Sequence, residues 1–165
     1  MNHIKNYIVD SMEYIYSDSY NEIIPNIYLG SKNSATDKSL LDKIDLVINC
    51  SQEIPFFSSK TKNLRVDVPD NLSLQCNLNI LVYLHKFMPI IMDYYDNNKR
   101  ILIHCRAGMQ RSATVVACFL MKKFRFNKDT SIQFIRAKRP IAFFPGPNFN
   151  LSLELFQRDL ENRNN

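Results

Sequence analysis

The hydrophobic positions of this chain change their spacing several times, and each spacing predicts one kind of element. Near the start, Ile4, Ile8, Met12 and Ile15 follow one another at helical intervals, which predicts an amphipathic helix within residues 1–20. Short apolar runs of strand length come next. They cover residues 22–24, 26–29, 46–48, 64–68 and 101–103.

Longer segments with helical spacing separate these runs. The helix expected over residues 77–95 contains Pro89, which we expect to kink it or to begin a new turn. Further helices are expected over residues 37–42, over residues 112–123, from a cap at Asp129 to Ala137, and from Pro147 and Asn148 onward. Strands that alternate with helices predict a single-domain α/β fold with a central, mostly parallel sheet flanked by helices.

Length and composition agree with one folded domain. The chain has 165 residues, of which 45% are hydrophobic and 22% are charged, as in average globular proteins. No apolar run reaches the roughly 18–20 residues that a membrane span needs, and the first residues lack the continuous apolar core of a secretory signal. The sequence therefore predicts a cytoplasmic protein with no membrane partner.

Charge and cysteine spacing narrow the chemistry. The chain has 21 lysines and arginines against 16 aspartates and glutamates, and a net charge of +5 favours an anionic partner. The cysteines, Cys50, Cys76, Cys105 and Cys118, show no CxxC spacing. This argues against a zinc knuckle or a thioredoxin-like pair and predicts reduced thiols.

A candidate phosphate site lies between a predicted buried strand and a predicted buried helix. Residues 104–112 read His-Cys-Arg-Ala-Gly-Met-Gln-Arg-Ser. A loop that enters a helix presents unpaired backbone N–H groups and the positive end of the helix dipole, and both bind phosphate. Gly108 permits the tight turn that such a loop requires. The expected phosphate-binding residues are Arg106, Ala107, Gly108, Met109, Gln110 and Arg111.

The same loop carries a nucleophile. The positive field of the loop favours the thiolate of Cys105, which is the attacking form of cysteine. Arg111 is expected to return over the loop and to hold two phosphate oxygens with its planar guanidinium. The hydroxyl of Ser112 is expected to donate to the sulfur of Cys105 and so to help the thiolate leave.

The role of His104 stays open at this stage. It either holds the loop through hydrogen bonds to backbone groups or is a buried histidine whose hydrogen bonds are satisfied elsewhere. The scheme requires no metal and no cofactor, and the sequence has no HExxH, EF-hand or Asp-rich cluster.

Residues 104–112 match the signature HCxxGxxRS, and the chain resembles the cysteine-dependent dual-specificity protein phosphatases. The resemblance runs from about residue 22 to residue 156 and includes the family-like segments at residues 27–31, 46–51 and 117–121. It implies a protein-tyrosine-phosphatase-like fold with the catalytic domain in residues 21–165. It also implies hydrolysis of phosphotyrosine, phosphoserine and phosphothreonine in proteins through a cysteinyl-phosphate. The segment that holds Arg139, Pro140 and Pro147 to Phe149 resembles the one whose Asn supports the phosphate loop, which assigns that role to Asn148.

A cysteine phosphatase also needs an acid that protonates the leaving oxygen. The resemblance places this acid at Asp70, after Pro69 on a loop. Asp67 is the rival, but the alternation of Val66, Asp67 and Val68 puts it inside a predicted strand and favours a structural role for it.

Substrate choice is less constrained than mechanism. A chain of 165 residues has little room for the phosphotyrosine-recognition loop of the larger tyrosine phosphatases, so we expect a shallow cleft and phosphoprotein substrates of both kinds. Arg106, Arg136, Lys138 and Arg139 either extend a positive surface around the cleft, which favours acidic or doubly phosphorylated targets, or form a solvated helix face. An RNA 5′-phosphatase and an inactive phosphate-binding module are the alternatives. Nucleic acid is disfavoured because no interleaved aromatic and basic stripe is present.

The N-terminal stripe suggests a second partner. The catalytic domain begins only near residue 21, so the stripe of Ile4, Ile8, Met12 and Ile15 packs either on its own domain or on a second copy of the chain. This arrangement is similar to that of poxvirus virion dual-specificity phosphatases, which implies a homodimer through residues 1–20. If the source is a virus, the location becomes the host cytoplasm or the virion.

Overall fold

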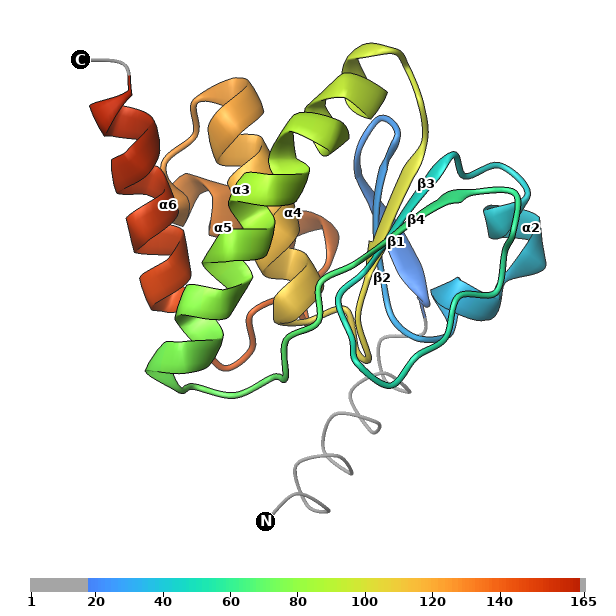
Figure 1. Cartoon of the computed structure of the whole chain (residues 1–165), viewed down its shortest axis with the longest axis horizontal. Helices are drawn as coiled ribbons and strands as arrows, with labels where there is room; N and C mark the ends of the chain where they lie inside the picture. The colour runs from blue at the N-terminus through green and yellow to red at the C-terminus, as the bar shows by residue number, and fades with distance from the viewer. Residues whose placement is uncertain (1–17, 164–165) are drawn as a thin grey trace.

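Residues 18–163 are described by a computed structural model, in which one sheet carries helices on both of its faces (Figure 1). The strands are β1 (Tyr20–Ile24), β2 (Ile27–Gly30), β3 (Leu46–Asn49), β4 (Lys62–Arg65) and β5 (Ile101–His104). The helices are η1 (Ser34–Thr36), α2 (Lys38–Leu41), α3 (Leu74–Asp96), α4 (Arg111–Phe124), α5 (Lys128–Lys138) and α6 (Asn150–Asn162). The α/β fold with flanking helices is confirmed.

The sheet has the order β1-β2-β5-β3-β4, and only its edge strand β1 runs antiparallel to its neighbour within the described residues. Leu29, Ile103 and Ile48 stand side by side across β2, β5 and β3. β3 and β5 are buried along their whole length, because both faces of the sheet are covered. The mostly parallel sheet expected from the sequence is therefore present.

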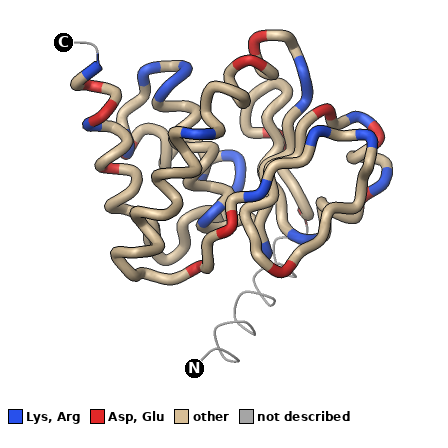
Figure 2. The backbone as a smooth tube through the Cα atoms, viewed as in Figure 1, with Lys and Arg blue, Asp and Glu red and all other residues tan. Residues whose placement is uncertain are grey.

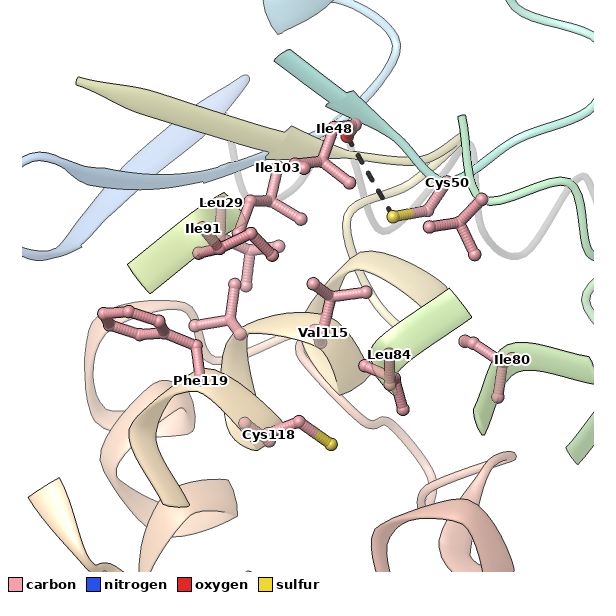
Figure 3. Close-up of a cluster of buried hydrophobic side chains, with 14 of the residues drawn as sticks. Leu29, Ile48, Cys50, Ile80, Leu84, Ile91, Ile103, Val115, Cys118 and Phe119 are labelled. Atoms are coloured by element: carbon pink, nitrogen blue, oxygen red, sulfur yellow. Dashed lines mark hydrogen bonds between the residues drawn. The ribbon is translucent and has the colours of Figure 1, made fainter. Parts of the chain in front are cut away.

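The larger core lies between the sheet and the helices α3 to α6. Figure 3 shows side chains of the sheet, such as Ile48 and Ile103, facing Val115 and Phe119 of α4. Every residue of α4 from Arg111 to Met121 is buried, so this helix runs through the centre of the layer. A smaller core with Leu40, Val47 and Leu102 lies on the opposite face, beneath α2.

The strand predicted over residues 64–68 is shifted, because the observed β4 spans Lys62–Arg65. β4 pairs with β3 only as far as Asn49, the last residue of that strand, so the ladder ends there. Val66 and Val68 are buried beyond the ladder, in a segment that leads to α3. Asp67 is therefore an exposed residue after the strand, and its predicted place inside a strand is wrong.

Two helix starts also differ from the prediction. α5 is capped by Asn127, whose side-chain oxygen accepts a hydrogen bond from Thr130 N at 2.8 Å, whereas Asp129 lies in the first turn. α6 begins at Asn150 rather than at residues 147–148, because Asn148 makes contacts outside the helix. α3 begins earlier than expected, at a cap formed by Ser73, and runs on through Pro89.

The helix predicted over residues 1–20 falls mostly outside the described residues, which begin at residue 18, and Tyr20 already belongs to β1. Between residues 18 and 163 there is no helix with both the length and the apolar character needed to cross a bilayer.

Candidate active site

A cavity of about 360 Å³ opens where β5 ends and α4 begins. Parallel α/β sheets bind ligands at this end of their strands. Four segments of the chain line the cavity. They are residues 105–111 except Gly108, Pro69 with Asp70, Gln52 with Glu53, and Phe144 with Pro145 and Asn148.

Gly108 sets the shape of the loop between β5 and α4. Its φ of +66° lies in the left-handed region, which side chains disfavour. A Cβ atom at this position would lie 2.6 Å from the carbonyl oxygen of Gly30 at the end of β2. The loop therefore packs directly on the β2 backbone, and only glycine fits this contact.

The carbonyl groups of the loop are held from outside. Arg139, buried to 2% exposure, donates from Nη2 to Ala107 O and from Nε to Gly108 O, each at 3.0 Å. The other outward donors are Lys32 N to Arg106 O, Phe143 N to Met109 O, and Thr114 N to Gln110 O. By contrast, the N–H groups of residues 107–110 have no acceptor within the described part of the chain. Carbonyls fixed outward and unpaired N–H groups make a loop suited to an anion.

Cys105 lies at the floor of this loop and is 2% exposed. The hydroxyl of Ser112, in the first turn of α4, lies 3.1 Å from the Cys105 sulfur in hydrogen-bonding geometry. Cys105 lines the cavity, so the sulfur belongs to the site and not to the apolar core alone. The contact anticipated between Ser112 and Cys105 is thus present.

Arg111 begins α4 and is 5% exposed. One of its terminal nitrogens donates to Val68 O at 3.3 Å, while its Nε is buried with no hydrogen-bond partner among the described residues. The same Nε lies 4.0 Å from Asp70 Oδ2 across the cavity. An unpaired guanidinium N–H at the edge of a loop of unpaired amides is a second feature that suits an anion.

The two candidate acids occupy different places. Asp70 lines the cavity, and its Oδ1 accepts a hydrogen bond from Asn148 Nδ2 at 2.8 Å. Asp67 is exposed and accepts from Gln52 Nε2 at 2.8 Å. Of these two aspartates, only Asp70 lines the same cavity as Cys105 and Arg111. An acid that protonates the leaving oxygen needs this position.

Asn148 touches both sides of the site. Its backbone N–H donates to Gln110 Oε1 at 2.9 Å, and its side chain holds Asp70. Gln110 in turn donates to the carbonyls of Phe144 and Gly146, each at 3.0 Å. The predicted link between Asn148 and the phosphate loop therefore runs through its backbone and Gln110, while its amide positions the candidate acid.

His104, the last residue of β5, is buried beside the loop. Burial lowers the pKa of His104 from its ordinary value of 6.5 to about 4; the backbone of Cys105 opposes the shift and the charge of Arg65 adds to it. The imidazole is therefore neutral at physiological pH. A neutral ring does not add a positive charge to the phosphate site. Its Nδ1 is buried with no hydrogen-bond partner among the described residues, so a histidine whose hydrogen bonds are all satisfied elsewhere is wrong, while the ring does meet the backbone of Cys105 in the loop.

Of the two interpretations of the basic residues, a positive surface around the cleft or a solvated helix face, neither holds for Arg139. This residue is buried and fixes the loop from behind, with Nη1 also bonded to Asn21 Oδ1 at 2.8 Å. Arg136 and Lys138 are exposed on α5 and do not belong to the lining of the cavity in the described part of the chain, whereas Arg106 does. Charge alone does not distinguish a buried arginine that fixes a loop from an arginine on the surface, so the charge pattern did not predict this role.

Sequence reasoning also missed the outer rim. Gln52, Glu53 and Phe144 line the cavity from loops that carry no recognisable motif.

Within residues 18–163, no group of three His, Cys, Asp or Glu side chains is close enough to hold a metal ion.

Comparison with known proteins gives a consistent result. A model of the family described as "Dual specificity phosphatase, catalytic domain" matches residues 27–159. Dual specificity protein phosphatase 16 of Homo sapiens is 33% identical over 146 residues, which cover 86% of this chain and 21% of that protein. The protein 123R of Invertebrate iridescent virus 6, which carries the name of a tyrosine phosphatase, is 29% identical over 143 residues, with coverage of 87% and 95%.

Solved structures agree on the fold. The crystal structure of human DUSP28 superposes with a TM-score of 0.79 at 23% identity, covering 87% of this chain and 96% of that one. The chain spans only about a fifth of the length of the human relative named above, and so matches one domain of it.

Proposed function

The chain belongs to the dual specificity phosphatase family, and we propose that it hydrolyses phosphotyrosine as well as phosphoserine and phosphothreonine in proteins. The observation that carries this proposal is the placement of Cys105 beneath a loop of unpaired N–H groups, with Asp70 facing Arg111 at 4.0 Å across the same cavity. A nucleophile, an anion site and an acid thus share one space.

In the first proposed step, a phosphate monoester binds to the loop and two of its oxygens meet the Arg111 guanidinium. The thiolate of Cys105 attacks phosphorus in line with the leaving oxygen, so the S–P bond forms while the P–O bond breaks. Asp70, in its acid form, gives its proton to the leaving oxygen of the Tyr, Ser or Thr side chain.

In the second step, water hydrolyses the cysteinyl-phosphate. Asp70, now a carboxylate, takes a proton from the water that attacks phosphorus, and the S–P bond breaks. Ser112 donates to the sulfur that leaves, which stabilises the thiolate. The outward donors on the loop carbonyls, with Arg139 foremost, keep the N–H groups directed at the phosphate in both steps.

The test is phosphate release from a phosphotyrosine peptide, a phosphothreonine peptide of the same sequence, and a triphosphorylated RNA. We expect release from both peptides, and a loss of at least about 10⁴-fold in kcat for Cys105→Ser, because the attacking group is removed. Cys118→Ser is the matched control, since Cys118 is also buried but lies in the apolar core (Figure 3).

Three other outcomes would contradict the proposal. Release from RNA alone would keep the mechanism and make the chain an RNA 5′-phosphatase. Tight phosphopeptide binding without turnover would make it an inactive phosphate-binding module. Equal losses in the two cysteine variants would remove the special role of Cys105.

We also propose that residues 1–20 pair two copies of the chain. The support is the apolar stripe of Ile4, Ile8, Met12 and Ile15 in the sequence. Sedimentation of the full chain is expected to give a dimer, and Ile8→Glu with Met12→Glu is expected to give a monomer. A monomer in both cases would contradict the pairing. The cytoplasmic location stays a prediction.

A further inference from the structure

The mouth of the cavity has one wall that the proposed mechanism does not use. Gln52 and Glu53 lie on the loop after β3 and both line the cavity. This loop is fixed in place by Arg65, which donates to the carbonyls of Ser51 and Ile54, and by Asn49, whose Nδ2 donates to Ile54 O at 2.7 Å. Glu53 is thus an exposed side chain on a well-anchored segment.

The charged groups that line the cavity divide by role. Arg111 and Arg106 are the cations that line the cavity, and the planar guanidinium of Arg111 suits a phosphate monoester. The buried Nε of Arg111 has no hydrogen-bond partner among the described residues, which marks where the anion belongs. Asp70 is held by Asn148 and faces Arg111. Glu53 is the remaining charged residue in the cavity lining.

Glu53 is available to a ligand. One of its carboxylate oxygens accepts a hydrogen bond from Gln52 N at 3.1 Å, and it forms no ion pair within residues 18–163. Asp67 lies close by, because Gln52 Nε2 donates to its Oδ1. Figure 2 shows in red where acidic residues lie along the backbone, including positions at the lower edge of the sheet in that view.

A second part of the lining, in the segment before α6, has no charged residue in the described part of the chain. Phe144, which is 45% exposed, and Pro145 form it, while Gln110 fixes the backbone of Phe144. A peptide bound with its phosphate in the loop therefore has both an apolar surface and a carboxylate within the lining of the cavity.

We propose that Glu53 makes the site selective for phosphorylated residues that have Lys or Arg as a direct neighbour in the substrate. The inference rests on the proposed function and adds the substrate class to it. It is opposite to one of the two interpretations of the basic residues in the sequence, the one in which a positive surface that includes Arg139 favours acidic or doubly phosphorylated targets. An acidic neighbour, or a second phosphate, would meet Glu53 with like charge.

The test uses phosphothreonine peptides of one sequence with Lys, Ala or Glu on both sides of the phosphorylated residue. For the unchanged chain, we expect kcat/KM to be about tenfold higher with Lys than with Glu, as two exposed charge contacts allow. Glu53→Gln keeps the acceptor for Gln52 N and removes the charge, so we expect the Lys-to-Glu ratio to fall to about threefold or less. Because the contact is exposed, raising the salt to about 0.5 M should shrink the ratio as well.

Asp42→Asn is the matched control, because it changes the net charge equally at an exposed residue next to α2 that does not line the cavity. This variant should keep the ratio. A ratio near one in the unchanged chain, or the same fall in both variants, would overturn the inference while peptide hydrolysis continued to support the proposed function.

A binding measurement separates this inference from the proposed function. Affinities of the same three peptides for Cys105→Ser, with and without Glu53→Gln, need no turnover. If no peptide is hydrolysed, the proposed function fails, and these affinities still decide the inference. A preference for Lys that Glu53→Gln reduces would support it, and equal affinities or no binding would overturn it.

Discussion

The phosphate loop and the segment that carries Asp70 face each other across one cavity, but they are built in different ways. The loop is buried, and each carbonyl from Arg106 to Gln110 has a donor outside the loop. Asp70 is partly exposed and is held by one hydrogen bond, from Asn148, and by the nearby charge of Arg111. Rigid binding groups thus face a lightly held acid, which suits a group that must give and take a proton in turn.

After replacement of the nucleophile Cys105, replacement of the candidate acid Asp70 is expected to have the largest effect on kcat. Asp70→Asn should lower kcat for phosphothreonine peptides by about 10² to 10⁴-fold, because the poor leaving oxygen then departs without a proton. The loss should be smaller for p-nitrophenyl phosphate, whose leaving group needs little protonation. Asp67→Asn is the matched control and should stay within about threefold, since Asp67 contacts Gln52 outside the cavity. A larger loss of kcat in Asp67→Asn than in Asp70→Asn would make Asp67, and not Asp70, the acid.

On the side of the phosphate loop, we expect one added methyl group to lower activity. Gly108→Ala would place a Cβ atom 2.6 Å from Gly30 O and 2.9 Å from Arg139 Nη2, at a φ of +66°. The loop backbone must then move, and a displacement of this size near reacting atoms costs about 10²-fold in kcat/KM. Gly146→Ala is the control, because nothing lies within 4 Å of its added Cβ. Steady-state kinetics of both variants, with their melting temperatures, would show whether the close contact at Gly30 matters.

The buried histidine beneath the loop gives a smaller effect, on stability. Its folded-state pKa of about 4 lies below the ordinary 6.5, so the unfolded chain takes up the proton first. The contribution of neutral His104 to the free energy of unfolding is complete above pH 6.5 and is lost as the pH falls toward 4. Between pH 7 and pH 5 the loss from this residue is about 2 kcal/mol.

Urea unfolding at the two pH values measures this loss. His104→Asn should remove it, so that its own pH 7 to pH 5 difference is smaller than that of the unchanged chain. Equal pH differences in the two proteins would mean that His104 is not the group that titrates.

The contrast between the two sides also explains what the sequence was able to predict. The residues of the loop are contiguous, and a buried strand, a nine-residue motif and a buried helix follow one another without a gap, as residues 101–124 show. Local physics dominates there, because a helix start exposes N–H groups wherever it is placed. The sequence therefore determined the α/β class, the loop, and the order of Cys105, Arg111 and Ser112 in it.

Tertiary structure decided which distant residues complete the site. Arg139 follows Gly108 by 31 residues and binds its carbonyl, and Asn148 is 78 residues from Asp70 and binds its side chain. The end of the β3–β4 ladder, and not an alternation of apolar residues, put Asp67 outside the strand. Glu53 reached the mouth of the cavity through a loop anchored by Arg65. These contacts depend on how separate segments pack, and spacing along the chain carries no record of the distance between segments that fold onto one another.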